Sequence, residues 1–307
     1  MHKIIFECET ITPMFLAGAD GKTPELRAPS IKGALRFWWR AMHGHLELGE
    51  LRKKEAEIFG GVGEKEGKSK LIIQVQEKSI NLGTYTPLPH HTGRDNCIPC
   101  NDIGYKKCKK AFRLPCIMPE SEFNVIISFI ETNEINYKYL ESLLLVFAYL
   151  GALGKRSRRG FGALNIKTIN KNPVSNIIDL NFVLEHLNNI VPNRFKLEND
   201  VIKLTEKNNY YLNYPFIKQI KLGKKYNNWK TLLKDIGFAT HKYNNPPKDC
   251  SLGKVSRQDR FASPIFVSII KINSNYYPIM TTLYGAPKFK NCNVNEKKQR
   301  DFINEFC

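Results

Sequence analysis

The sequence has no long apolar run. In its 307 residues the longest nearly unbroken apolar stretch covers residues 143–153, whereas a helix that spans a membrane needs about 20 apolar residues. This stretch therefore predicts a buried helix of a globular protein. Residues 1–7 also lack the layout of a secretory signal peptide, so we expect a cytoplasmic protein.

Acidic residues are scarce relative to basic ones. The chain holds 29 Asp and Glu residues against 47 Lys and Arg residues, which gives a formal net charge of +18. A surface this basic favours a polyanionic partner such as nucleic acid. An anionic membrane would be the competing partner, but no basic amphipathic anchor or lipidation motif is present.

Common catalytic patterns are missing as well. The sequence contains no P-loop, no Ser/His/Asp spacing and no pair of carboxylates beside its basic segments. We therefore expect no catalytic residues and no catalytic cofactor.

Apolar periodicity in the first half predicts six elements. Ile31, Leu35, Trp38, Met42 and Leu46 recur at spacings of three and four, which is typical of one face of a helix. In chain order we expect a strand over residues 3–12, a helix over 31–48, strands over 70–77 and 123–130, a helix over 136–150 and a strand over 163–169. Residues 60–69 form a glycine- and charge-rich turn. This order is the ferredoxin-like βαββαβ arrangement, an antiparallel sheet with helices on one face.

The second half is harder to interpret. A helix is expected over residues 177–189, strands over 265–272 and 276–283, and a terminal helix over 296–306. The predicted fold class is α+β, with two ferredoxin-like (RRM-like) domains, the second degenerate. The first domain covers residues 1–169 with a cysteine-rich insertion near 79–118, a linker covers 170–175, and the second domain covers 176–307.

Basic residues gather in three segments. Lys32, Arg36 and Arg40 form a stripe on the predicted helix, with no acidic residue between positions 32 and 40 to neutralise it. Residues 151–162 hold Lys155, Arg156, Arg158 and Arg159 between glycines, whose backbone N–H groups could form a nest for a phosphate. Arg257 and Arg260 precede a predicted strand. The first two segments could instead be solvated surfaces.

Four stretches resemble a known family. Residues 11–20 and 24–40, the loop that ends in Arg158-Arg159-Gly160-Phe161-Gly162, and Arg260 with residues 262–264 are similar to RAMP proteins of CRISPR systems. Together they resemble the first subunit of the type III-B (Cmr) effector complex.

The resemblance implies a non-catalytic RNA-binding subunit near the 3′ end of the guide RNA, which aids capture of target RNA in antiviral defence. The implied partners are guide RNA, target RNA and the other subunits of the complex. The basic residues then become RNA contacts, which give affinity and register rather than sequence readout. The predicted contacts are Lys32, Arg36, Arg40, Lys155, Arg156, Arg158, Arg159, Arg257 and Arg260.

Two alternatives stay open. Some RAMP relatives cleave CRISPR RNA without metal by histidine acid–base chemistry, and His43 and His45 lie at the end of the basic helix. A scaffold that binds only neighbouring subunits is the other alternative.

The insertion carries a cysteine cluster. Cys97, Cys100, Cys108 and Cys116 follow His90 and His91, and a CxxC pair has the spacing of two zinc ligands. This pattern predicts a structural zinc site, unless the cysteines are free thiols in a loop.

Overall fold

The structure is a computed structural model that describes most of the chain. The described residues are 1–61, 63, 67–90, 112–175, 179–205, 214–244, 249–255, 260–284 and 293–307. Within them, no helix is both long enough and apolar enough to cross a membrane.

The first half folds into an antiparallel sheet in the order β2-β5-β1-β6-β7. Its strands are β1 (His2–Thr10), β2 (Leu71–Ser79), β5 (Glu122–Phe129), β6 (Leu164–Ile169) and β7 (Asn172–Pro173). The four longer strands confirm the predicted ones. In β1 the buried side chains alternate, because one face of the sheet lies against helices and the other does not.

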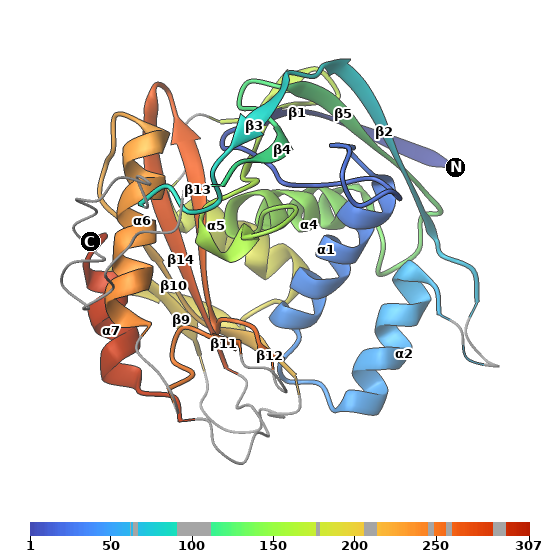
Figure 1. Ribbon diagram of the computed structural model, residues 1–307. Coiled ribbons are helices and arrows are strands. Elements are labelled where there is room, and N and C mark those ends of the chain that lie inside the picture. The colour runs from blue at the N-terminus through green and yellow to red at the C-terminus, as the bar shows by residue number, and fades with distance from the viewer. Residues whose placement is uncertain are drawn as a thin grey trace.

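Helices α1 (Ala28–Met42) and α4 (Tyr137–Leu150) cover that inner face (Figure 1). The predicted first helix was too long, because it ends at Met42 and a separate helix, α2 (Leu48–Phe59), follows. The break falls at Gly44, where a Cβ would lie only 2.4 Å from the Phe216 ring. Phe216 belongs to the second half, so the apolar pattern of the helix alone could not reveal the break.

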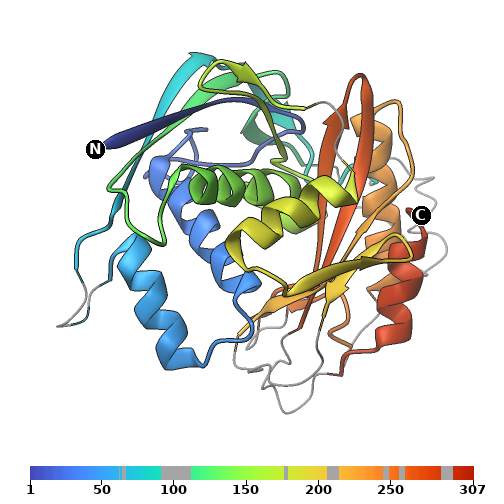
Figure 2. The same cartoon turned by 180° about the vertical axis from the view of Figure 1, so that it is seen from behind.

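The second half forms another antiparallel sheet in the order β13-β14-β10-β9-β8. Its elements are α5 (Leu180–Ile190), β8 (Phe195–Glu198), β9 (Val201–Leu204), β10 (Phe216–Leu222), α6 (Trp229–Tyr243), β11 (Lys254–Val255), β12 (Arg260–Phe261), β13 (Ile265–Ile272), β14 (Asn275–Tyr284) and α7 (Glu296–Asn304). Helices α6 and α7 lie on its outer side, and α5 lies beside α4 on the inner side (Figures 1 and 2).

Two short pieces complete the described chain. Strands β3 (Leu82–Tyr85) and β4 (Leu114–Ile117) pair at the two ends of the predicted insertion. A 3₁₀ turn, η1 (Ser157–Arg159), lies in the glycine-rich loop and packs on β13.

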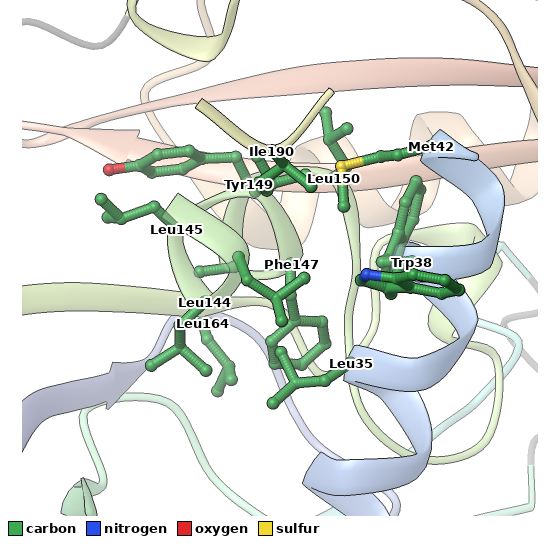
Figure 3. Close-up of a cluster of buried hydrophobic side chains, with 14 of the residues drawn as sticks. Leu35, Trp38, Met42, Leu144, Leu145, Phe147, Tyr149, Leu150, Leu164 and Ile190 are labelled. Carbon is green, nitrogen blue, oxygen red and sulfur yellow. The ribbon is translucent and has the colours of Figure 1, made fainter. Parts of the chain in front are cut away.

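Two hydrophobic clusters each contain residues of both halves. Figure 3 shows Leu35, Trp38 and Met42 of α1 packed toward Phe147 of α4, with Ile190 of α5 nearby. The same cluster continues into β9, β10, β13 and β14 of the second sheet. The predicted linker over residues 170–175 contains β7, which pairs with β6 and so belongs to the first sheet. The buried cluster that both sheets share crosses the predicted domain boundary.

Candidate nucleic-acid interface

The basic stripe of α1 faces α2, which supplies a carboxylate to it. Arg36 Nε donates to Glu55 Oε1 at 2.6 Å, and Arg40 Nη1 donates to the same oxygen at 2.5 Å. The Glu55 side chain is 6% exposed, whereas the two arginine side chains are each 35% exposed. The expectation of a stripe without acidic compensation is therefore wrong, because one buried carboxylate compensates part of the charge of two arginines.

The stripe nevertheless lines a strongly basic cavity of about 640 Å³ between α1, α2 and the described residues 60–61, 63 and 67–69. Its cationic lining residues are Lys32, Arg36, Arg40, Arg52 and Lys68, and Glu55 is the one acid that lines it in the part of the chain the structure describes. Burial, and then the charge of Arg36, lowers the pKa of Lys32. An excess of positive charge in a recess attracts a polyanion.

The glycine loop is packed inside the protein rather than open. Gly154, Gly160 and Gly162 have φ angles of +85°, +79° and +71°, which residues with a side chain rarely adopt. The N–H of Gly160 donates to Val267 and that of Gly162 to Pro13, both at carbonyl oxygens. These N–H groups are therefore not available to an anion, and the expected phosphate nest is not formed by them.

Arg159 points into the protein. It is 8% exposed, and burial lowers the pKa of its guanidinium to about 9. Its guanidinium donates to the carbonyl oxygens of Arg158, Ile265 and Leu252 and to Ser263 Oγ, at 2.8–3.0 Å. The predicted RNA contact by Arg159 is therefore corrected to an internal role that ties the loop to Leu252, Ser263 and Ile265.

Arg158 is half-buried beside it. The guanidinium donates to the Ser263 carbonyl and lies over the Phe266 and Phe37 rings, with centroids 4.4 and 5.6 Å away. Burial lowers the pKa of Arg158 to about 10, so it remains charged at neutral pH. Phe37 belongs to α1, so Arg158 connects the loop to the helix that carries the basic stripe.

The other predicted loop and strand residues differ in exposure. Lys155 is exposed, and Arg156 is half-buried in a left-handed conformation with φ of 60°. Arg260 lies in β12, where its backbone pairs with Val255. Arg257 lies outside the described residues.

Gly33 marks an exposed position on α1, one residue after Lys32. Glycine inside a helix costs up to about 1 kcal/mol relative to alanine. A Cβ added at Gly33 would meet no atom within 4 Å in the described part of the chain. Packing against the described residues therefore does not explain the glycine.

A comparison with family models matches residues 7–165 to the RAMP superfamily. The chain belongs to the RAMP superfamily. The match includes α1, the basic cavity and the glycine loop, whereas Arg257, Arg260 and the residues that Arg158 and Arg159 contact in the second half lie outside it.

Two curated proteins of Pyrococcus furiosus are similar to this RAMP protein. The CRISPR system Cmr subunit Cmr1-2 is 27% identical over 187 residues, which are 55% of this chain and 97% of that protein. Cmr subunit Cmr1-1 is 29% identical over 175 residues, which are 52% of this chain and 46% of that protein.

Solved structures share the fold over the full length. The crystal structure of apo Cmr1 from Pyrococcus furiosus matches 100% of this chain and 97% of that chain, with a TM-score of 0.61 and 18% identity. A chain of a type III-B Cmr-beta complex bound to cognate target RNA matches 99% of this chain and 98% of that chain, with a TM-score of 0.57 and 14% identity. These matches support the α+β class with antiparallel sheets.

The two candidate catalytic histidines lie at the end of α1. His43 is 8% exposed and stacks on Trp39 with ring centroids 4.0 Å apart, and burial lowers its pKa to about 3. His45 is half-buried, and burial together with Arg194 and Lys54 lowers its pKa to about 4. Both imidazoles are therefore neutral at pH 7, which suits neither of them to act as the acid in RNA cleavage.

Of the predicted zinc ligands, only Cys116 is described. It lies buried in β4, its Sγ is 3.6 Å from Met118 Sδ, and burial raises the pKa of the thiol to about 11. Cys116 belongs to a buried apolar cluster that also includes Phe161 and Leu232. Cys97, Cys100 and Cys108 lie outside the described residues, and no metal-like cluster of three ligands occurs within those that are described.

Three residues of the basic cavity were missed by sequence reasoning. Arg52 and Glu55 belong to α2, which was not predicted, and Lys68 lies in the segment interpreted only as a turn. The charged run of residues 52–55 was the one available signal. Its place opposite α1 depends on the tertiary fold.

Proposed function

We propose that this RAMP protein is a non-catalytic RNA-binding subunit of a type III-B CRISPR effector complex. Its similarity to Cmr1 proteins and its basic cavity support the proposal. We also propose that it contacts guide RNA near the 3′ end and aids capture of target RNA, beside other subunits of the complex. Neutral histidines and the absence of catalytic patterns in the sequence favour a binding role over the nuclease alternative.

Both halves fit a ferredoxin-like, RRM-like interpretation. In the first half β1, α1, β2, β5, α4 and β6 follow one another, and the strands lie in the order β6-β1-β5-β2. In the second half β10, α6, β13, β14 and α7 follow the same sequence of element types, with the strands in the order β10-β14-β13. Strand β9, which precedes β10 in the chain, occupies the place of the missing fourth strand. The second copy is degenerate in this sense.

The proposed RNA contacts lie along α1 and its basic cavity. Three residues, Lys32, Arg52 and Lys68, contribute positive charge to the cavity. Glu55 pairs with both Arg36 and Arg40 and so fixes them at the cavity wall. Lys155 adds an exposed cation on the loop that reaches α1 through Arg158. Charge of this kind binds the phosphate backbone with little dependence on base sequence.

Gly33 indicates where on α1 the RNA would bind. An exposed helical glycine beside Lys32 allows a phosphate backbone to approach the α1 main chain closely. A side chain at position 33 would obstruct the RNA backbone, although the described part of the chain leaves room for it. The helix should therefore gain stability, and RNA binding should weaken, when Gly33 is replaced.

The test compares Gly33→Ala with Gly49→Ala in α2. Each replacement should raise the free energy of unfolding by up to about 1 kcal/mol through helix propensity. Only Gly33→Ala should weaken binding of single-stranded RNA, by about tenfold in a filter-binding or anisotropy titration at fixed salt. Equal RNA affinities for the two variants and the wild type would contradict an RNA contact along this edge of α1.

A structural zinc site remains a second proposal. Because Cys116 is buried in the core, we propose that the zinc ligands are Cys97, Cys100 and Cys108, with a histidine as the fourth. Elemental analysis of protein purified without chelator should find about one zinc per chain, and Cys116→Ala should keep it. Loss of zinc in Cys116→Ala with the other three cysteines intact would contradict this ligand set.

A further inference from the structure

The first sheet ends in an open edge at β2. In the strand order β2-β5-β1-β6-β7, β2 pairs with β5 on one side, and no described strand lies on its other side (Figure 1). β2 runs over nine residues, whereas β7, at the opposite end of the sheet, has two. An edge strand presents unpaired N–H and C=O groups to which a strand of another chain can bind.

The register of β2 shows which of its backbone groups point outward. The N–H of Ile130 donates to the Lys70 carbonyl oxygen at 3.2 Å, so Lys70 turns its backbone groups toward β5. Successive residues of an edge strand turn these groups alternately toward the paired strand and away from it, so Leu71 and every second residue after it face the open edge. Leu71 agrees with this pattern, because its N–H and C=O groups both form hydrogen bonds with Ser69 Oγ.

Three further residues turn their backbone groups to the open edge. They are Ile73, Val75 and Glu77, which precede the register shift between Glu77 and Ser79. No hydrogen bond to their outward N–H and C=O groups occurs within the described residues. The edge therefore offers three donors and three acceptors in the spacing that an added strand requires.

Exposed apolar side chains lie beside these backbone groups. Ile72 and Ile130 are 51% and 58% exposed, on the face of the sheet that α1 and α4 do not cover. Ile72 pairs with Ser128 of β5, and Ile130 follows Ser128 by two residues, so the two isoleucines are diagonal neighbours on that face. One apolar side chain of an added strand can cover both of them.

The same end of the edge is cationic. Lys68 and Lys70 precede β2, and neither forms an ion pair with a carboxylate among the described residues. An acidic residue on an added strand would therefore be attracted to this end of the edge.

A second copy of this chain fits the edge poorly. If two β2 strands paired antiparallel about a two-fold axis at residue 73, 74 or 75, Ile72 would lie opposite Gln74, Gln76 or Lys78 of the other copy, respectively. Its exposed apolar surface would meet a polar side chain in each of these registers. Each copy also carries a formal net charge of +18, which opposes self-association.

We propose that the β2 edge binds an extended segment of another subunit of the type III-B complex, which adds one strand to the five strands of the first sheet. The segment places an apolar residue over Ile72 and Ile130 and an acidic residue beside Lys68 and Lys70. Main-chain hydrogen bonds along β2 supply the affinity, and these side chains supply the specificity. The proposal rests on the function proposed above, because it takes the partner from that complex.

The experiment measures residue-resolved hydrogen exchange of the full chain, both free and co-purified with the other subunits of the complex and guide RNA. The amides of Ile73, Val75 and Glu77 should exchange rapidly in the free chain and about tenfold more slowly, or slower still, in the assembly. The amides of Ile72 and Gln74 already face β5, so they should be protected in both states and serve as the internal control.

Two pairs of variants test the same edge by titration of an assembly that lacks this chain. Ile72→Lys should weaken binding by about tenfold or more, because a charge replaces the apolar contact. Leu82→Lys is the matched control, since Leu82 is 61% exposed and lies in β3, and it should bind as the wild type does. Glu77→Pro, which removes an outward N–H group, should weaken binding as well, whereas Glu77→Ala should not.

Each contrary outcome has a definite meaning. Unchanged exchange of the three outward amides in an assembly that contains the chain would overturn the proposal for this edge and leave the proposed function intact. Failure of the wild-type chain to join the other subunits would overturn both. A free chain that is dimeric by light scattering, with these amides already protected, would replace the subunit by a second copy. Equal binding by Ile72→Lys and the wild type would also overturn the proposal.

Discussion

At the scale of single residues, Glu55 gives the arginines of the basic stripe a structural role as well as a role in binding. Arg36 and Arg40 alone suggest charges that only an external polyanion could balance. With Glu55 between them they also hold α1 against α2, so they serve the fold and the basic cavity together. Because each guanidinium is about a third exposed, water screens part of this interaction and the pair is weaker than a fully buried one.

Replacing Glu55 should therefore destabilise the protein to a moderate extent. We expect Glu55→Gln to lower the free energy of unfolding by about 1–3 kcal/mol, because both arginines lose a charged acceptor. Glu50→Gln, on the same helix in an exposed pair with Lys54, should change it by less than about 0.5 kcal/mol. Urea unfolding of both variants measures the difference, and equal effects would mean that the shared contact adds no stability.

His43 should make the stability depend on pH. Its ordinary pKa is near 6.5, and burial lowers the pKa in the folded protein to about 3. Between these values the unfolded chain binds a proton that the folded chain does not, so stability falls as the pH falls. The slope from this one residue approaches about 1.4 kcal/mol per pH unit below pH 6.

Urea unfolding between pH 7.5 and pH 4.5 should show this decline, and His43→Phe should reduce its slope. His45→Gln should reduce it less, since that ring is half-exposed. The same slope in His43→Phe and in the wild type would mean that His43 is protonated in the folded protein.

At the scale of elements, the glycine loop holds two sheets together. It follows α4, and its backbone contacts residues 13–15 on one side and β13 on the other. Glycine is needed at Gly154 and Gly162 because main-chain atoms of neighbouring segments occupy the space that a Cβ atom would fill. At Gly162 the nearest such atom is the Leu153 carbonyl oxygen, 1.9 Å from an added Cβ.

We expect Gly162→Ala to destabilise the protein by more than the roughly 3 kcal/mol of an ordinary substitution. Gly21→Ala is the matched control, because Gly21 also has a positive φ of +68° but has no atom of the described chain within 4 Å of an added Cβ. It should cost only the conformational strain, roughly 1–2 kcal/mol. Thermal unfolding compares them, and similar losses would show that the close approach at Gly162 is easily relieved.

At the scale of the whole molecule, the two halves depend on each other. Ser142 of α4 contacts His186 of α5 at 3.0 Å, and Ser268 Oγ of β13 donates to the Gly151 carbonyl at 2.7 Å. The buried residues of α5 and part of those of the second sheet, such as Ile220 and Phe266, belong to the same cluster as those of α1 and α4. A chain cut between the halves would expose this apolar surface to water.

A fragment of residues 1–175 should therefore fail to fold on its own. We expect circular dichroism to show no cooperative thermal transition for the fragment, whereas the full chain should unfold in one transition. Strong binding of a hydrophobic dye by the fragment would accompany this result. A cooperative transition at the temperature of the full chain would instead mean that the first half is an independent domain.

The sequence by itself determined the strands and helices with strong periodicity, the α+β class and the family, because these depend on local patterns of apolar residues and on contiguous motifs. It also located the basic segments. Only the tertiary structure decided their use. Arg159 is turned inward by acceptors about 100 residues away in the chain, and Arg36 and Arg40 share Glu55 from a helix that follows. Charge is a property of the sequence, but burial and partners arise when distant segments pack together.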